Sequence, residues 1–373
     1  MKIIQIQHND RRQQKAFIQL PFDLYKNNPY WVPPIRMDIK KIFKPENAFY
    51  KYGEAAFFLA IDKDNHPLGR LAVANNTRYN QFHKSKTAFF YYFECVDDHK
   101  VAGGLFEKGF DWAKEKGLNH MIGPKGFTVL DGFGLLIEGF EYQPAFGQAY
   151  NLAYYPALIE VQGFSKVKDI LTGWVDRNTK WPEKIIKAAN IIEKRRCIQT
   201  PTFKTKSDLL SIKDDLHTLY NDSLAEPAGN PPLTDEDMDQ MVAQLLWIVD
   251  PKLIKIMYDD KKPIGFILAY PDIGSALQRS KGRLFPFGWL QILLERKRTQ
   301  WIDLNGAGVI KEYQRLGVTS IIINELYKNL MESDQYQYGE LLQFREENIN
   351  SLLEASNIDI HFHKKHRLYE KGL

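Results

Sequence analysis

The stretch VIKEYQRLGVTSIIINELYKNLMES, Val309 to Ser333, decides the fold because it joins an apolar, strand-like run to a helix through a short polar loop. The loop carries Gln314, Arg315 and Gly317, and apolar residues recur at helical spacing after it. The first turn of a helix has unpaired backbone N–H groups and a positive dipole end, which together bind phosphate. Gly317 lets a ligand approach the backbone, and Arg315 adds a fixed cation. The stretch therefore predicts a phosphate-binding loop.

Two segments far apart in the sequence repeat one pattern of strand, polar turn and strand. They are FFLAIDKDNHPLGRLAVAN, Phe57 to Asn75, and KLIKIMYDDKKPIGFILAY, Lys252 to Tyr270. A further strand, an amphipathic helix and a short strand follow each of them in the same order. We therefore expect two related α+β domains, with residues 1–178 in the first, a linker helix at 179–204 and residues 205–373 in the second.

Composition narrows the class of protein without choosing a ligand. The chain has 373 residues, a net charge of +4 and two cysteines without a metal-ligand spacing, so we expect no disulfide framework and no metal. The first twenty residues lack the apolar core of a signal peptide, and no later run reaches the length of a membrane span. We expect a cytoplasmic protein with no membrane partner and no strong affinity for nucleic acid, and its oligomeric state stays open.

The segment VIKEYQRLGVTS resembles the acetyl-coenzyme A loop of the GNAT N-acetyltransferase superfamily, whose pattern is Gln/Arg, two residues, Gly, one residue, Gly/Ala. Thr319 departs from the final Gly/Ala. The resemblance implies two domains, each a mixed, largely antiparallel twisted sheet flanked by helices. Taken whole, the chain resembles bacterial tandem-GNAT proteins of unassigned substrate. By resemblance, the residues that bind acetyl-CoA as co-substrate are Val309, Ile310, Gln314, Arg315, Leu316, Gly317, Val318, Thr319 and Asn348.

The N-terminal half resembles the same fold with an eroded cofactor loop. Its loop reads VDDHKVAGGLF, so Asp97 and Asp98 stand where a phosphate needs positive charge. The segment YYPALIEVQGFSKVKDILTGW, Tyr154 to Trp174, is similar to the last helix and strand of a GNAT domain. We therefore expect that this half binds no coenzyme A.

The catalytic groups are less defined. Asp303 shares strand parity with Val309 and is one candidate base; Glu347, next to Asn348, is the other. Each also fits a structural or exposed carboxylate. The tyrosine that the superfamily often uses is absent from both halves, where Ile159 and Ala355 occupy its place.

Three functions follow from the resemblance. The first is an acetyl-CoA dependent N-acyltransferase acting on a small amine or amino-acid-like acceptor bound between the domains. The others are a catalytically inactive GNAT-fold ligand-binding protein and a Fem-like aminoacyl transferase using charged tRNA.

Two further segments each have two interpretations. The Gly-rich, aromatic segment from Ile122 to Tyr155 could shape a pocket or hold the two halves together. An insertion before Trp301 carries an apolar helix, Trp289 to Leu294, that ends in the basic residues 296–298. Those cations could meet phosphates or form a solvated helix end.

Overall fold

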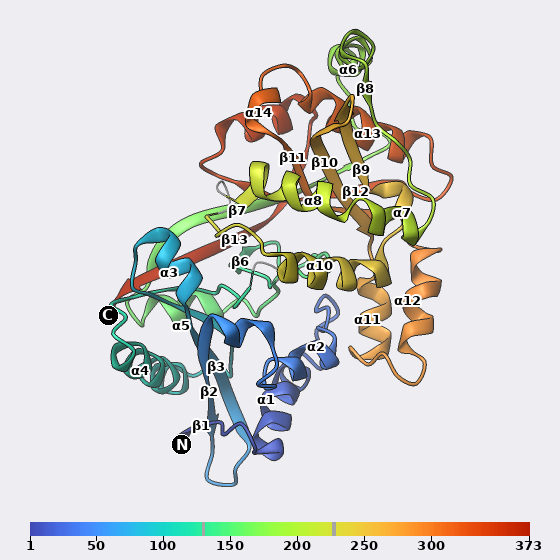
Figure 1. Ribbon diagram of the computed structural model, residues 1–373. Helices are drawn as coiled ribbons and strands as arrows, with labels where there is room; N and C mark the ends of the chain where they lie inside the picture. The colour runs from blue at the N-terminus through green and yellow to red at the C-terminus, as the bar shows by residue number, and fades with distance from the viewer. Residues whose placement is uncertain (129–130, 226–228) are drawn as a thin grey trace. The chain divides into compact units, whose positions relative to one another are not determined.

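The computed structural model describes residues 1–128, 131–225 and 229–373. The chain forms two compact units (Figure 1). Unit 1 comprises Met1–Ile170, Gly274–Gln291 and Lys364–Leu373, and unit 2 comprises Leu171–Ile273 and Ile292–His363. Unit 1 thus includes two segments from the second half of the sequence. The division at 1–178, 179–204 and 205–373 stays a prediction.

The elements of unit 1 follow the order expected from the sequence. Strands β7 and β13 and helix α12 each begin in one unit and end in the other. The elements are β1 Lys2–Gln5, α1 Arg11–Leu24, α2 Arg36–Lys41, η1 Ala48–Lys51, β2 Gly53–Ile61, β3 Pro67–Asn76, α3 Thr77–His83, β4 Thr87–Cys95, α4 His99–Glu115, β5 His120–Gly123, β6 Leu135–Glu138, α5 Tyr155–Glu160, β7 Ser165–Asp176, α11 Gly274–Ser280, α12 Gly288–Arg296 and β13 His361–Gly372.

The sheet of unit 1 has the strand order β1-β2-β3-β4-β5-β13, and β6 also pairs with β13. Only the β4–β5 pair among these is parallel. Alternate residues of β2 enter two hydrophobic clusters, with Phe58 on the side of α4 and Phe57 on the side of α1. Figure 1 shows α4 and α1 on different sides of the β2–β3 hairpin. The sheet is therefore buried on both faces.

Unit 2 repeats this plan. Its elements are α6 Glu183–Arg196, β8 Ile198–Gln199, α7 Lys206–Ser211, α8 Lys213–Tyr220, the π-helical segment η2 Asn221–Ala225, α10 Asp235–Ile248, η3 Pro251–Leu253, β9 Lys255–Asp259, β10 Lys262–Pro271, β11 Trp301–Val309, η4 Lys311–Tyr313, α13 Thr319–Met331, β12 Tyr338–Arg345 and α14 Ile349–Asn357.

The sheet of unit 2 has the order β7-β12-β11-β10-β9-β8. The β11–β12 pair is parallel, and the β9–β10 hairpin is antiparallel like the β2–β3 hairpin, so both hairpins predicted from the sequence are confirmed. Apolar residues of α13, among them Ile323, Leu326 and Leu330, pack against Ile302 and Leu341 of the two parallel strands. This packing fixes the start of α13 at the end of β11. Among the described helices, none is long and apolar enough to cross a membrane.

Candidate functional site

The parallel strands β11 and β12 separate part of the way along their length. Their pairing ends at Leu304↔Leu341, so in the described part of the chain Asn305–Val309 has a strand neighbour on the β10 side alone. The register between β10 and β11 shifts at this point and leaves Asn305 as the extra residue of a β-bulge. The side-chain amide of Gln343 on β12 donates a hydrogen bond of 3.2 Å to Oδ1 of Asn305. The sheet therefore opens after Leu304.

Val309 presents its backbone to this opening. The N–H of Ile310 donates to the carbonyl of Ile264 on β10 at 3.0 Å, so the peptide groups of Val309 point away from β10. Nε2 of Gln314 donates to the carbonyl oxygen of Val309 at 2.9 Å. The structure thus joins two of the predicted cofactor-binding residues, and it leaves the N–H of Val309 directed toward the opening.

The loop after β11 has the backbone geometry of an anion site. Arg315 and Gly317 adopt left-handed conformations, with φ of 64° and 84°. Val318 is right-handed, and a left-handed residue followed by a right-handed one turns successive N–H groups to the same side. Within the described residues, the N–H groups of Gly317, Val318 and Thr319 donate to no protein atom. Three free donors therefore stand at the positive end of α13.

Neighbouring side chains hold this loop in place. The hydroxyl of Tyr313 donates to Asp259 at 2.7 Å, and Lys262 forms an ion pair with Glu312. On the other side, α6 lies against α13, and a Cβ added to Gly317 would lie 2.3 Å from Cδ1 of Ile192. The loop is therefore anchored from β9, β10 and α6 rather than held by its own sequence alone.

The predicted cofactor-binding residues differ in exposure. Val309, Ile310 and Val318 are buried; Gln314, Arg315, Leu316 and Asn348 are exposed; Gly317 and Thr319 are half-buried. Asn348 begins α14, because its carbonyl accepts the N–H of Leu352 at 3.1 Å. The sequence therefore located this helix start correctly, while the role of Asn348 toward a cofactor stays a prediction.

In unit 1 the equivalent strand edge is closed. The N–H of Val96 donates to the carbonyl of Leu68 at 2.9 Å, just as Ile310 donates to Ile264, so Cys95 corresponds to Val309. The hydroxyl of Tyr154 donates to the carbonyl of Cys95 at 2.7 Å. The N–H of Cys95 donates to the hydroxyl of Tyr155 at 3.0 Å. Two tyrosines thus occupy both backbone groups of Cys95, whereas in unit 2 Gln314 occupies the carbonyl of Val309 and leaves its N–H accessible.

The two units also differ in side-chain size along the strand residues just before Val309 and Cys95. Residues 305–308 of unit 2 read NGAG, whereas residues 91–94 of unit 1 read YYFE. The side chain of Glu94 is 12% exposed, accepts hydrogen bonds from the hydroxyls of Tyr25 and Tyr155 and lies 3.5 Å from the guanidinium of Arg70. Burial raises the pKa of the Glu94 carboxyl, an effect that Arg70 opposes. Unit 1 thus has large side chains where unit 2 has small residues, and in unit 2 Ser223 and Leu224 of η2 lie against Gly308 and Gly306.

Asp98 adds a second obstacle in unit 1. Its carboxylate caps α4 by accepting the N–H groups of Lys100 and Val101 at 2.7 and 3.4 Å. A carboxylate therefore already satisfies the helix N-terminus that would otherwise bind phosphate. The structure gives Asp98 a capping role that charge reasoning from the sequence did not identify.

The candidate base Asp303 lies inside the sheet and is 1% exposed. On β11 it stands opposite Tyr270 of β10 and Glu340 of β12. Glu340 is also buried and its carboxylate lies 3.1 Å from Nε2 of His363. The prediction that Asp303 shares a face with Val309 is wrong. The bulge at Asn305 shifts the alternation, so Asp303 pairs with Tyr270 and Val309 with Gly265, which lie on opposite faces of β10.

The other candidate, Glu347, lies exposed in the turn after β12. Glu347 interacts electrostatically with Arg345, and Arg345 also interacts electrostatically with Tyr220 at the end of α8. Burial raises the pKa of the Tyr220 hydroxyl above its ordinary value of about 10, at which a tyrosine is already protonated at neutral pH. The two candidate carboxylates thus occupy different environments. The sequence alone did not single out Tyr220. In the structure a π-helical segment begins directly after it, and such segments are frequent at functional sites.

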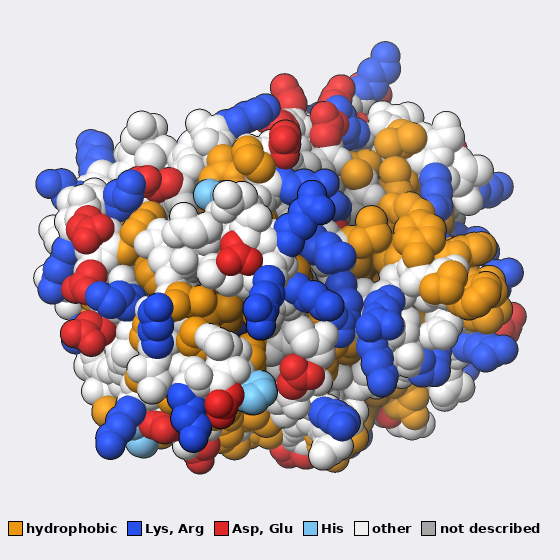
Figure 2. All heavy atoms as spheres, turned by 90° about the horizontal axis from the view of Figure 1, so that it is seen from below, with side chains coloured by type: hydrophobic (Ala, Val, Ile, Leu, Met, Phe, Trp, Pro, Cys, Tyr) orange, Lys and Arg blue, Asp and Glu red, His pale blue; other side chains and the backbone are white. Residues whose placement is uncertain are grey.

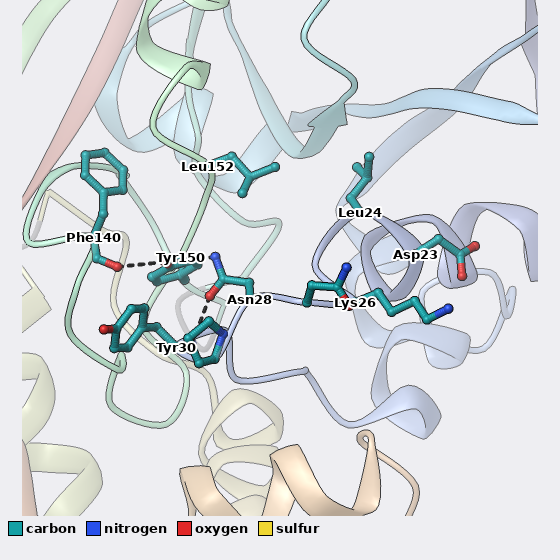
Figure 3. Close-up of a pocket in the computed structure, with 10 residues that line it drawn as sticks. Asp23, Leu24, Lys26, Asn28, Tyr30, Phe140, Tyr150 and Leu152 are labelled. Carbon is teal, nitrogen blue, oxygen red and sulfur yellow. Dashed lines mark hydrogen bonds between the residues drawn. The ribbon is translucent and has the colours of Figure 1, made fainter.

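A separate pocket of about 520 Å³ lies in unit 1 (Figure 3). The end of α1 and the segment up to Tyr30 form one wall, and Phe140, Tyr150 and Leu152 form the other. Asn28 donates to the hydroxyl of Tyr150 at 3.1 Å, and that hydroxyl donates to the carbonyl of Phe140 at 2.8 Å. The aromatic segment after Ile122 therefore does line a pocket, as one of its two interpretations predicted.

One group of side chains among the described residues has the spacing of a metal site. Asp62, Asp64 and His66 bring their ligand atoms within 4.8 Å of one another in the turn of the β2–β3 hairpin. The carboxylate of Asp62 already accepts the N–H groups of Asp64 and His66, both at 2.8 Å. These contacts explain the cluster as turn geometry.

Comparisons with known proteins bear on the relatives and the fold of the chain. No protein-family model matches the sequence. Protein YghO of Escherichia coli (strain K12) is 27% identical over 370 residues, which cover 96% of this chain and 93% of that protein. A bacterial ceramide synthase of Caulobacter vibrioides is 25% identical over 371 residues, which cover 96% of this chain and 94% of that protein.

Among solved structures, a tandem GNAT protein from the clavulanic acid biosynthesis pathway matches with a TM-score of 0.55 at 10% identity. The match covers 100% of this chain and 98% of that chain. An identity this low compares folds rather than activities. The prediction of an α+β chain with two GNAT-like domains is confirmed, and the chain has the fold of tandem GNAT proteins.

Proposed function

We propose that this protein is an acyl-CoA dependent N-acyltransferase whose unit 2 binds the acyl-CoA. The observation that carries the proposal is the contrast between two equivalent strand ends. The N–H of Val309 faces an opening, whereas Cys95 is bonded to two tyrosines. A single acyl-CoA site per chain, in unit 2, is the expected consequence.

The residues of unit 2 fit the parts of coenzyme A in order. The amide-rich pantetheine arm would pair with the edge of β11 at Val309, as an added strand does. The free N–H groups of Gly317, Val318 and Thr319 would bind the pyrophosphate at the start of α13. Arg315, exposed on the same loop, would add a charge-assisted contact. The bound co-substrate supplies an activated acyl group as a thioester.

Proton transfer falls to groups near the separation of β11 and β12. An amine acceptor must lose a proton, and the departing thiolate must gain one. Glu347 is exposed and could take the proton of an acceptor directly. Asp303 is buried and could take it only by proton transfer through neighbouring residues. Tyr220, whose hydroxyl is protonated at neutral pH, is our candidate for protonating the thiolate.

Neither the loop nor the strand edge distinguishes one acyl group from another, because both contact the coenzyme part. Acetyl-CoA with a small amine or amino-acid-like acceptor follows from the loop resemblance. The relative named as a bacterial ceramide synthase supports another pair, since ceramide is the amide of a long-chain amino alcohol and a fatty acid. The proposal therefore names acyl-CoA as donor and a primary amine as acceptor, and acyl length is what the assay decides.

The test is thiol release by the purified full-length protein. Acetyl-, octanoyl- and palmitoyl-CoA would each be combined with amino acids, small amines and a long-chain amino alcohol, and Tyr220→Phe and Glu347→Gln would be run beside the parent. Release that depends on the amine supports the enzyme. Coenzyme A binding without release from any pair would favour the inactive ligand-binding alternative. Absence of coenzyme A binding together with binding of charged tRNA would favour the Fem-like alternative.

A further inference from the structure

Helix α12 and the loop before it carry an apolar surface exposed to solvent. Phe285 and Phe287 are 66% and 69% exposed. Four more large apolar side chains follow on α12, whereas Ile292 points inward and is buried. The exposed set, which we call the α12 apolar patch, consists of Phe285, Phe287, Trp289, Leu290, Leu293 and Leu294. Figure 2 shows orange side chains gathered on the right of this face, where α12 lies, with blue Lys and Arg side chains beside them.

The segment that presents the patch is firmly held. The N–H of Arg36 donates to the carbonyl of Gly282 at 2.9 Å, and Nε of Arg36 donates to the carbonyl of Lys281 at 3.1 Å. The backbone N–H of Trp289 donates to the carbonyl of Leu284 at 2.9 Å, and its indole N–H donates to the carbonyl of Pro286 at 3.0 Å. These bonds close the loop and keep its rings outside. The exposure is therefore a built feature of the fold.

Positive charge flanks the patch at both ends. Between Arg279 and Arg298 the sequence has six basic residues and a single acidic one, Glu295. This excess is larger than the net charge of +4 of the whole chain. Arg283 and Lys281 on one side and Lys297 and Arg298 on the other are exposed. A rim of one sign around an apolar centre differs from the mixed rim of an ordinary protein interface.

We propose that the α12 apolar patch docks this protein onto the surface of an anionic phospholipid bilayer. Aromatic and leucine side chains would enter the boundary between headgroups and acyl chains, while the flanking lysines and arginines meet lipid phosphates. Since none of the described helices can cross a bilayer, the protein would lie on the surface. The proposal departs from the expectation, made from the sequence, of no membrane partner, and it does not depend on the proposed enzyme activity.

The test is co-sedimentation of the full-length protein with phosphatidylcholine vesicles, with and without about one third phosphatidylglycerol. We expect binding to the anionic vesicles that weakens in about 0.5 M salt. Phe285→Ser/Phe287→Ser and Lys297→Glu/Arg298→Glu should each lower partitioning at least about tenfold. The matched controls are Val161→Ser, at a residue that is also 66% exposed, and Lys108→Glu/Lys114→Glu on α4, and both should bind like the parent.

A second readout locates the contact. In a Cys197→Ser background, which leaves only the buried Cys95, an environment-sensitive fluorophore on Phe287→Cys should report an apolar environment when anionic vesicles are added. The same fluorophore on Val161→Cys should not. No vesicle binding by the parent, or equal binding by the patch variants, would overturn the proposal. A parent dimer that becomes a monomer on Phe285→Ser/Phe287→Ser, without vesicle binding, would assign the patch to a second copy of the chain instead.

Discussion

Replacing Arg315 by glycine should separate ligand binding from stability at the candidate phosphate site. Arg315 holds φ at 64°, which costs a non-glycine residue about 1–2 kcal/mol. Glycine removes that strain but makes the unfolded chain more flexible, which costs about 0.5–1 kcal/mol. The free energy of unfolding of Arg315→Gly should therefore be unchanged or higher by up to about 1.5 kcal/mol.

Affinity should move the other way. A charge-assisted hydrogen bond to phosphate contributes about 1.5–3 kcal/mol, so its loss weakens binding about ten- to a hundredfold. Isothermal titration with coenzyme A would measure the dissociation constant, and urea unfolding would measure stability on the same samples. Arg315→Ala retains the strained backbone and should lose affinity equally. The gap between parent and variant should narrow at high salt because Arg315 is exposed.

The matched control is Lys100→Ala, at the start of α4 in unit 1, which should bind coenzyme A like the parent. Unchanged affinity in Arg315→Gly would refute the phosphate site and leave the loop as an ordinary helix start. A large fall in stability would instead make Arg315 a structural residue whose conformation the fold requires.

Three further changes test other parts of the structure. Gly317→Ala should destabilise the protein by about 1–2 kcal/mol in urea unfolding, because φ is 84°; adding Ile192→Ala should relieve the contact at 2.3 Å but not the backbone strain. Asp98→Ala should lower stability by about 1 kcal/mol through loss of the α4 cap, and titration should still find one coenzyme A per chain. Burial raises the pKa of Asp169, but its bonds to Arg367 and a neighbouring lysine more than offset this and leave the pKa lowered. The stabilisation from Asp169 is therefore present above its ordinary pKa of about 3.9 and lost as pH falls below it, so Asp169→Asn should be less stable than the parent at pH 7 and equal to it in acid unfolding experiments.

Local patterns in the sequence predicted the loop and both hairpins because these depend on neighbouring residues. The positive φ of Gly317 follows from its place before a helix, and the start of α14 follows from Asn348. The opening between β11 and β12 could not be read this way. It depends on where pairing with β12 stops and on the bulge at Asn305, which only the partner strands determine.

The hydrogen bonds that occupy the strand edge of unit 1 could not be predicted from the sequence either. Tyr154 and Tyr155 lie about sixty residues from Cys95 in the sequence, and no residue pattern near Cys95 indicates that they bond to it by hydrogen bonds. Asp303 illustrates a different limit. Strand parity assumes an unbroken alternation of side chains, but the bulge at Asn305 places Asp303 and Val309 on opposite faces of the strand. The sequence therefore predicted the loop before α13, whose cofactor binding stays a prediction, and it named Asp303 and Glu347 as candidate bases, whose roles also stay predictions.

Several features at the opening of unit 2 lower stability in the absence of a ligand, and together they are our reason to propose a ligand site there. Arg315 and Gln343 both hold left-handed angles, with φ of 64° and 66°, and three N–H groups at the start of α13 have no protein acceptor among the described residues. Each of these features lowers stability when nothing is bound. In unit 1, Asp98 caps the equivalent helix and two tyrosines hydrogen-bond to Cys95, although Tyr92 on β4 keeps a positive φ of 52°. The contrast between a closed edge in unit 1 and an open edge in unit 2 is what the proposed acyl-CoA site in unit 2 requires.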